Sequence, residues 1–169
     1  MPTPPRTAVP VSADIIEIER ALTHISYLTN RVRQHERLMA LAGVSLDRAA
    51  VALLRAMADS DALRPGELAV RLGVEASHIT RQVQQLQKTG YVTRVPDPDD
   101  RRAQRVQLTP VGRDAIGRIR DASRRGMEMA LGEWSPEELH QLATLFNRMV
   151  DDFLSSAAEE DDAGAPPTA

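Results

Sequence analysis

The stretch from Pro65 to Leu108 constrains the fold of this chain more than any other part of the sequence. Apolar residues recur at helical spacing over 65–72 and again over 76–89, with Gly73 between the two runs and Gly90 after the second. Two short β-branched runs follow, at 91–95 and 105–108, on either side of the charged segment PDPDDRRAQ. This order predicts two helices joined by a tight turn, then a hairpin with a long polar tip.

Helices are also predicted before this stretch. The segment from Ser12 to about Leu41 is expected to be one amphipathic helix capped by Ser12, because apolar residues recur every three or four positions: Ile15, Ile18, Leu22, Ile25, Leu28 and Val32. A second segment, 46–58, is so rich in apolar side chains that most of its circumference must be covered. We therefore assign it to the core.

Two more helices are predicted after the hairpin. Thr109 and Pro110 supply a cap and a first-turn proline, and the next helix has one apolar face made of Ala115, Ile116, Ile119 and Ala122. Ser135 and Glu138 form a capping box before the last helix. That helix carries an apolar seam at spacings of three and four: Leu139, Leu142, Phe146, Met149 and Phe153. The seams of the first and last helices predict one shared bundle.

Composition excludes several classes of chemistry. The 169 residues include no cysteine, so disulfides, thiolate metal sites and thiol redox sensing are excluded. The four histidines, His24, His35, His78 and His140, show no metal-ligand spacing, and neither a metal nor a cofactor is expected. No stretch approaches the roughly 20 apolar residues that span a membrane, and no signal-peptide core precedes the first helix, so a cytoplasmic protein without membrane contact is expected.

Charge is distributed unevenly along the chain. The net charge is −3, but residues 151–169 carry six acids and no base, which leaves +3 on residues 1–150. Six bases and three acids fall between Ala76 and Arg105, so this region has a local excess of three positive charges. An excess of that kind over a helix and a hairpin tip favours a polyanionic partner such as nucleic acid.

The helix predicted over 76–89 turns a polar face away from its apolar stripe. Ser77, Arg81, Gln84 and Lys88 lie on this outward face, and His78 and Thr80 lie on its flanks. These side chains offer the donors and acceptors that contact base edges and phosphates. The alternative for the helix is an ordinary solvated face, and the alternative for the hairpin tip is an ordinary solvated charge cluster. The combination of a helix-turn-helix with a following hairpin favours a winged helix that binds duplex DNA.

The residues from Leu46 to Arg113 resemble the winged-helix core of the MarR (multiple antibiotic resistance regulator) family of transcriptional regulators. The resemblance is strongest in the wing, where Asp100, Arg101 and Arg102 are followed by Leu108-Thr109 and Gly112. It implies a mainly α fold, with a winged helix-turn-helix core, a short β-hairpin wing, and a helical dimerisation bundle from the N- and C-terminal helices. The segments expected on this basis are a disordered N-terminus (1–11), an N-terminal dimerisation helix (12–45), the DNA-binding domain (46–109), C-terminal dimerisation helices (110–156) and a disordered acidic tail (157–169).

The resemblance also implies roles for individual residues. Ser77, His78, Thr80 and Arg81 match the family's positions that contact bases and phosphates, whereas His78 departs from the small residue usual there. Arg102 matches the minor-groove arginine, and the carboxylate of Asp100 is expected to hold the Arg102 guanidinium. The full set expected to contact DNA is Ser77, His78, Thr80, Arg81, Gln84, Lys88, Asp100, Arg101 and Arg102.

The resulting hypothesis is a homodimeric, ligand-responsive repressor that binds a palindromic operator in double-stranded DNA. A small aromatic or anionic effector would lie near Tyr27, Arg31, Arg55 and Met57, although packing and surface roles account for these four residues as well. The alternative is a winged helix that binds another protein instead of DNA. An enzyme is not expected, because the adjacent Ser77 and His78 point about 100° apart on a helix and cannot act as nucleophile and base.

Overall fold

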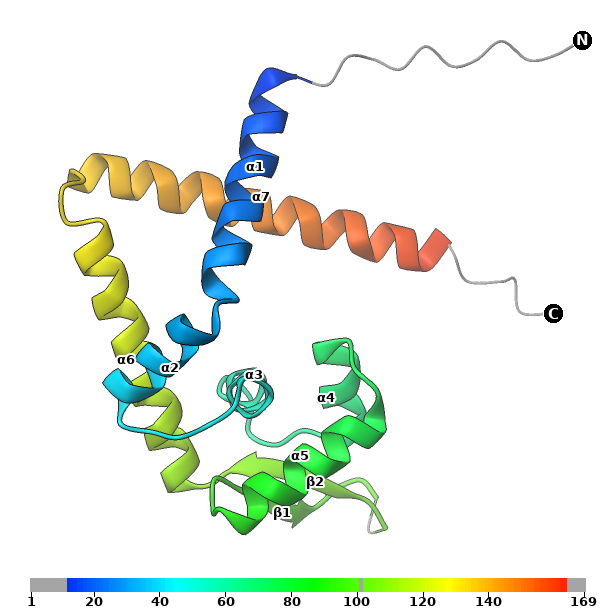
Figure 1. Ribbon diagram of the computed structural model, residues 1–169. Coiled ribbons are helices and arrows are strands. Elements are labelled where there is room, and N and C mark those ends of the chain that lie inside the picture. The colour runs from blue at the N-terminus through cyan, green and yellow to red at the C-terminus, as the bar shows by residue number, and fades with distance from the viewer. Residues whose placement is uncertain (1–11, 101, 164–169) are drawn as a thin grey trace, which may run out of the picture. The chain divides into compact units, whose positions relative to one another are not determined.

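The computed structural model describes residues 12–100 and 102–163 (Figure 1). In chain order, the described residues form α1 (Ala13–Thr29), α2 (Val32–Ala42), α3 (Arg48–Met57), α4 (Pro65–Leu72), α5 (Ala76–Lys88), β1 (Val92–Pro96), β2 (Gln104–Leu108), α6 (Pro110–Ala130) and α7 (Pro136–Ala163). The chain divides into two compact units, of which the first ends at Arg125 and the second begins at Gly126. The predicted fold class, mainly α with a short two-stranded hairpin, is confirmed.

The helix-turn-helix and the hairpin form where the sequence predicts them. Gly73 ends α4 in the left-handed conformation, with φ of +62°, and the turn leads into α5. The strands β1 and β2 then pair antiparallel, in a register that sets Val92 opposite Leu108. This register places Val92, Val106 and Leu108 in the interior, so the hairpin packs one face against the helices.

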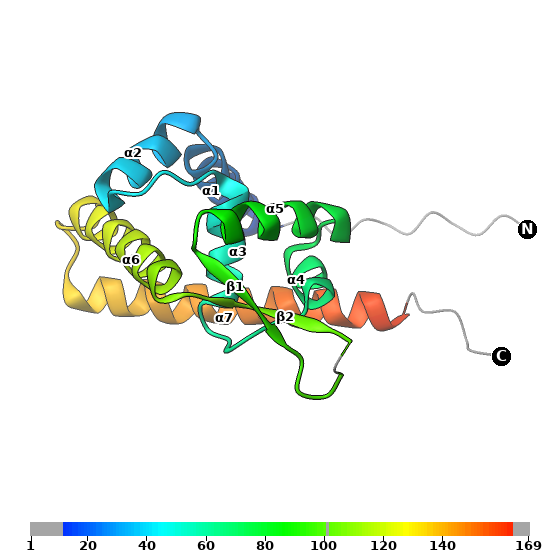
Figure 2. The same cartoon turned by 90° about the horizontal axis from the view of Figure 1, so that it is seen from below.

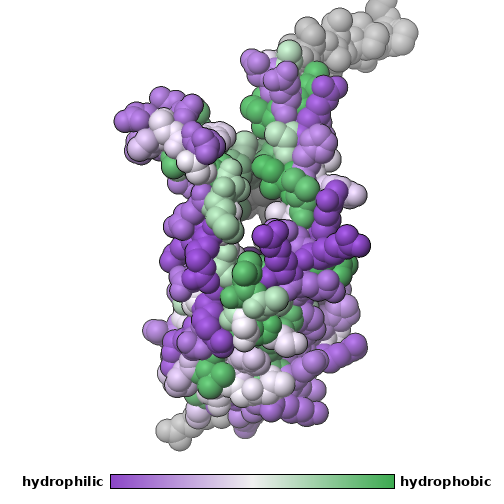
Figure 3. All heavy atoms as spheres, turned by 60° about the vertical axis from the view of Figure 1, so that its left-hand side comes forward, coloured by the Kyte–Doolittle hydropathy of each residue, from purple (hydrophilic) through white to green (hydrophobic). Residues whose placement is uncertain are grey.

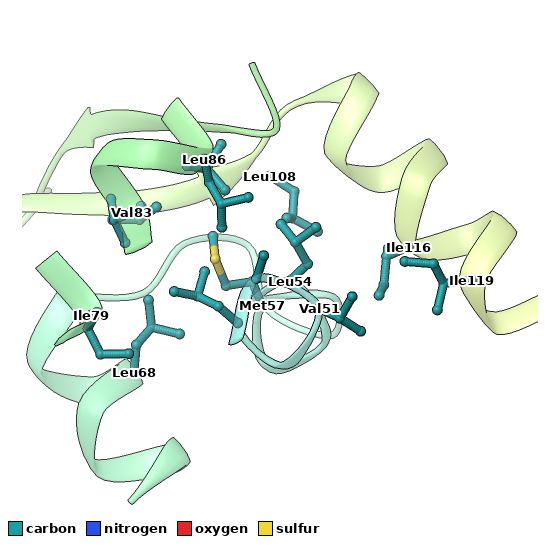
Figure 4. Close-up of a cluster of buried hydrophobic side chains, with 14 of the residues drawn as sticks. Val51, Leu54, Met57, Leu68, Ile79, Val83, Leu86, Leu108, Ile116 and Ile119 are labelled. Atoms are coloured by element: carbon teal, nitrogen blue, oxygen red, sulfur yellow. The ribbon is translucent and has the colours of Figure 1, made fainter. Parts of the chain in front are cut away.

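The core of the first unit is built around α3, which packs against α4, α5 and β2. Figure 4 shows Leu54 and Met57 of α3 directed toward Leu86 and Leu68, with Ile116 and Ile119 approaching from α6. Met39 and Ala42 of α2 join the same cluster. Residues on both sides of the predicted DNA-binding domain at 46–109 therefore help to form its core.

A close contact joins the end of α5 to the start of α6. The Thr109 hydroxyl donates to the carbonyl of Gly90 (2.6 Å), and the Thr109 N–H donates to the carbonyl of Tyr91 (3.0 Å). Gly112 lies against the same Tyr91 carbonyl, where an added Cβ would overlap it. The first turn of α6 is therefore fixed to the residues that lead into β1.

The prediction of one helix from Ser12 to Leu41 is wrong. α1 ends at Thr29, whose hydroxyl donates to the carbonyl of Ile25 (2.9 Å), and Arg31 is extended before α2 begins. Asn30 caps α1 through its N–H, which donates to Ser26. Thr and Asn side chains compete with the helical backbone for hydrogen bonds, whereas the apolar spacing used for the prediction runs through the break unchanged.

The boundary predicted at 156 is also too early, because α7 continues to Ala163. Alanine and glutamate have high helix propensity, and they prolong the helix into the acidic segment. The expected disorder of residues 1–11, and of the tail beyond residue 163, concerns positions outside the described residues. Among the helices formed by residues 12–163, none combines the length and apolar character of a membrane-spanning segment.

Each unit contains a helix with an exposed apolar face. α1 has no buried residue, and Figure 3 shows hydrophobic side chains along it. The exposed apolar residues of α1 include Ile15, Ile18, Ile25 and Leu28, and those of α7 include Leu139, Leu142, Phe146 and Phe153. These are the residues predicted to form seams between helices.

Candidate nucleic-acid interface

The outward face of α5 is polar and accessible. Ile79, Val83 and Leu86 bury the opposite side of the helix in the core. The candidate DNA contacts on α5 are all exposed, namely Ser77, His78, Thr80, Arg81, Gln84 and Lys88. The Thr80 hydroxyl donates to the carbonyl of Ala76 (2.9 Å) and can still accept a hydrogen bond. The helix therefore presents hydrogen-bonding groups without a large apolar side chain among them.

The wing tip is the loop that joins β1 to β2 and extends beyond α4 and α5 (Figure 2). Asp97 organises this loop although it lies at the base of the tip. Its Oδ1 accepts hydrogen bonds from the N–H groups of Asp99 (2.9 Å) and Asp100 (3.3 Å), and its own N–H donates to the carbonyl of Ala103 (3.2 Å). The tip is thus a hydrogen-bonded turn.

Two arginines bind the other oxygen of the same carboxylate. The Nε of Arg64, at the start of α4, lies 2.6 Å from Asp97 Oδ2, and the Nε of Arg105, on β2, lies 2.8 Å from it. Asp97 is only 2% exposed. Hydrogen bonds from Arg64 and then from Arg105 hold the pKa of Asp97 far below its ordinary range, against the opposing effect of burial. The carboxylate therefore stays ionised in the interior of the wing.

The expected contact between Asp100 and the Arg102 guanidinium is not the one that the structure contains. The Asp100 carboxylate instead accepts a hydrogen bond from the backbone N–H of Arg102 (2.9 Å). A turn of this kind is closed more readily by a short Asp side chain bonding two residues ahead than by a contact with a long side chain. Arg101 lies outside the described residues.

The cations of this surface are available to a ligand. Ion pairs within residues 12–100 and 102–156 involve Arg64, Arg105 and several arginines of α6 and α7, but not Arg81, Lys88 or Arg102. These three side chains are exposed. A polyanion would therefore meet them without first displacing an internal carboxylate.

The sequence prediction missed Arg64 and the burial of Asp97. Arg64 occupies the N-cap of α4, where a short polar side chain is usual. This departure was a sequence signal that the Arg64 side chain has a role other than capping. Asp97 was grouped with Asp99 and Asp100 as an acid of the hairpin tip, and no separate role was predicted for it. Its burial depends on Arg64, which lies 33 positions away along the chain.

The four residues suggested for an effector do not come together. The guanidinium of Arg31 stacks 4.7 Å from the centre of the Tyr27 ring, and both residues are exposed. Arg55 lies elsewhere, in a shallow depression shared with Asp59 and Arg71. Met57 is 1% exposed and belongs to the core, as Figure 4 shows, so it packs instead of lining a surface crevice. Within the described part of the chain, His, Asp and Glu form no cluster of three that would hold a metal ion.

Comparison with known sequences identifies related regulators. The profile of the MarR family matches residues 44–103. The uncharacterized HTH-type transcriptional regulator YdgJ of Bacillus subtilis is 30% identical over 110 residues, which are 65% of this chain and 66% of that protein. A second uncharacterized HTH-type transcriptional regulator, Mb0904 of Mycobacterium bovis, is 36% identical over 106 residues, or 63% of this chain and 66% of that protein. The matches thus span just under two thirds of the length of these relatives.

Solved structures share the fold over more of the chain. A MarR family protein from Bacillus stearothermophilus superposes with a TM-score of 0.77, covering 86% of this chain and 99% of that structure at 18% identity. The transcriptional regulator Tm0710 from Thermotoga maritima is 26% identical, with a TM-score of 0.59 and coverage of 89% and 99%. The similarity therefore includes helices on both sides of the winged helix-turn-helix.

Proposed function

This chain belongs to the MarR family, and from that premise we propose that it is a transcriptional regulator that binds double-stranded DNA through α5 and the wing. The observation that carries the proposal is the pairing of two elements in one compact unit. An exposed polar helix face with free cations lies beside a hydrogen-bonded wing that presents Arg102. In a winged helix, the first element enters the major groove and the second reaches the adjacent groove or backbone.

The proposal includes a homodimer and a palindromic operator. Its support is the exposed apolar surface of α1 and of α7, since helices with such seams bury them against other helices. A two-fold dimer presents the same α5 twice, and its half-sites are then inverted repeats about 34 Å apart, one turn of duplex. The related proteins are named as transcriptional regulators, and repression is our own addition to that role.

Control by a small aromatic or anionic effector is part of the same proposal. The stacked pair of Tyr27 and Arg31 supports it, because an exposed ring and a guanidinium together suit a ligand of that type. An effector changes DNA affinity only if it binds better to one arrangement of the two winged helix-turn-helix domains of the dimer than to another. The remaining two candidates, Arg55 and Met57, take no part in this pair.

The decisive experiment measures binding of the protein to the DNA upstream of its own gene, by mobility shift or fluorescence anisotropy. We expect affinity that falls steeply with salt, because neutralised phosphates release counterions. Arg81→Ala and Arg102→Ala should each weaken binding about tenfold or more, the scale of one lost arginine contact. Arg124→Ala is the control, since Arg124 is an exposed arginine on α6 that lies outside the proposed surface.

The result also decides between this function and a protein-interaction role. Unchanged affinity in both variants would refute the assigned surface. Absence of any salt-dependent duplex binding by the unmodified protein would refute DNA binding itself, and would favour a winged helix that recognises another protein.

A further inference from the structure

Residues 63 and 64 connect the helix-turn-helix to both strands of the wing. The backbone of Leu63 pairs with Val106 of β2 through two hydrogen bonds, of 3.0 and 2.8 Å. The Arg64 side chain reaches the end of β1, where its Nε donates to Asp97 (2.6 Å). The backbone N–H of Arg64 is bound separately, by the carboxylate of Glu67 (2.6 Å), so the side chain is not needed to cap α4.

A continuous path of hydrogen bonds runs from Arg64 to the backbone of Arg102. Asp97 accepts from Arg64 through one carboxylate oxygen and holds the N–H groups of Asp99 and Asp100 through the other. The Asp100 carboxylate then accepts the N–H of Arg102 (2.9 Å). Each hydrogen bond in this path restrains the residue that makes the next hydrogen bond, so the restraint extends from Arg64 to the backbone of Arg102.

Arg105 does not perform the same task, although it binds the same carboxylate oxygen. Arg105 belongs to β2, so its bond to Asp97 remains inside the hairpin. It also donates to Asp99 (3.2 Å), another residue of the tip. Of the two arginines that bind Asp97, only Arg64 belongs to the helix-turn-helix side.

We propose that Arg64 is a positioning residue for DNA binding, which fixes the wing tip, and with it Arg102, relative to α4 and α5. This inference rests on the proposed function, because the place of Arg102 matters to affinity only if the wing meets duplex DNA. A side chain that is ordered before binding loses less conformational freedom in the complex. The competing role for Arg64, whose side chain is 43% exposed, is a direct phosphate contact.

A double-mutant cycle separates the two roles. With Arg64→Ala we expect a loss of DNA affinity of about three- to tenfold, the scale of one side chain that must be ordered on binding. In the Arg102→Ala background the same change should cost less than about twofold, since coupled residues are not additive. The slope of log affinity against log salt should stay unchanged, whereas loss of a phosphate contact lowers it by about one.

Amide hydrogen exchange of the free protein supplies a readout that needs no DNA. In Arg64→Ala, the amides of Asp99, Asp100 and Arg102 should exchange faster, while those of α5 remain protected. Arg120→Ala is the matched control, because the Arg120 ion pair with Asp59 (2.9 Å) also joins distant parts of the first unit but does not touch the wing. Thermal unfolding of both variants shows whether each one is folded.

The outcomes distinguish this inference from the proposed function. Unchanged exchange at the wing tip, or losses of affinity that multiply fully in the double variant, would overturn the positioning role. Faster exchange at the tip in a protein that binds no duplex would leave Arg64 as the residue that orders the wing, and would overturn DNA binding instead.

Discussion

Replacing Gly112 by alanine is expected to destabilise the protein by about 2 to 3 kcal/mol, the cost of forcing an atom into a filled site. A Cβ at this position would overlap the carbonyl oxygen of Tyr91, and would lie 3.1 Å from the Tyr91 carbonyl carbon and 3.3 Å from Leu108. The Tyr91 carbonyl cannot retreat without cost, because it accepts a hydrogen bond from the N–H of Thr109 (3.0 Å). Urea unfolding at a fixed protein concentration measures the loss as a lower midpoint.

Gly117→Ala is the control for this prediction, because Gly117 lies in the same helix with no atom within 4 Å of the added Cβ. That variant should be as stable as the parent, or more stable by about 0.5 to 1 kcal/mol, since alanine favours the helix more than glycine does. Equal stability of both variants would show that α6 does not approach Tyr91 as closely as the structure indicates.

Replacing Asp97 by asparagine is expected to lower the Tm at neutral pH by roughly 10 °C, because it leaves Arg64 and Arg105 without their buried partner. The loss should depend on pH. Since the pKa of Asp97 is lower in the folded state, its contribution is complete above the ordinary carboxyl pKa of about 3.9 and declines as the pH falls below it. The Tm difference between the parent and Asp97→Asn should therefore stay constant from neutral pH down to about pH 5 and narrow between about pH 5 and pH 2.

Asp99→Asn provides the comparison, since Asp99 also binds Arg105 (3.2 Å) but has a side chain that is 78% exposed. An exposed ion pair contributes little, so this variant should unfold close to the parent at every pH. A Tm difference between the parent and Asp97→Asn that stays constant over the whole pH range would contradict the prediction. The stability contribution of the Asp97 carboxylate would then not depend on its ionisation.

The helix-turn-helix and the hairpin could be predicted from sequence because local signals define them. Gly73 and Gly90 adopt the left-handed conformation at the two ends where the sequence requires a stop, and Pro65 begins α4. The buried face of α6 likewise follows from the spacing of its apolar residues, Ala115, Ile116, Ile119 and Ala122. In each case, residues within one or two turns determine the outcome.

The organisation of the wing could not be predicted in the same way. The partners of Asp97 come from α4 and β2, and only folding brings them together around one carboxylate. Asp100 was correctly placed at the tip, but its partner is a backbone N–H, which the sequence does not distinguish from a guanidinium. The helix break at Asn30 was not predicted, because the spacing of apolar residues carries no information on where hydroxyl and amide side chains bind the backbone.

The joint at Thr109 and Gly112 has a mechanical consequence. The part of α6 that belongs to the first unit, Pro110 to Arg125, extends about 24 Å from this joint, so a rotation of roughly 5° there moves Arg125 by about 2 Å. Thr109 binds Gly90 and Tyr91, and the same rotation must therefore turn the root of the hairpin or break those bonds. A rotation of α6 about its first turn is therefore coupled to the orientation of the hairpin.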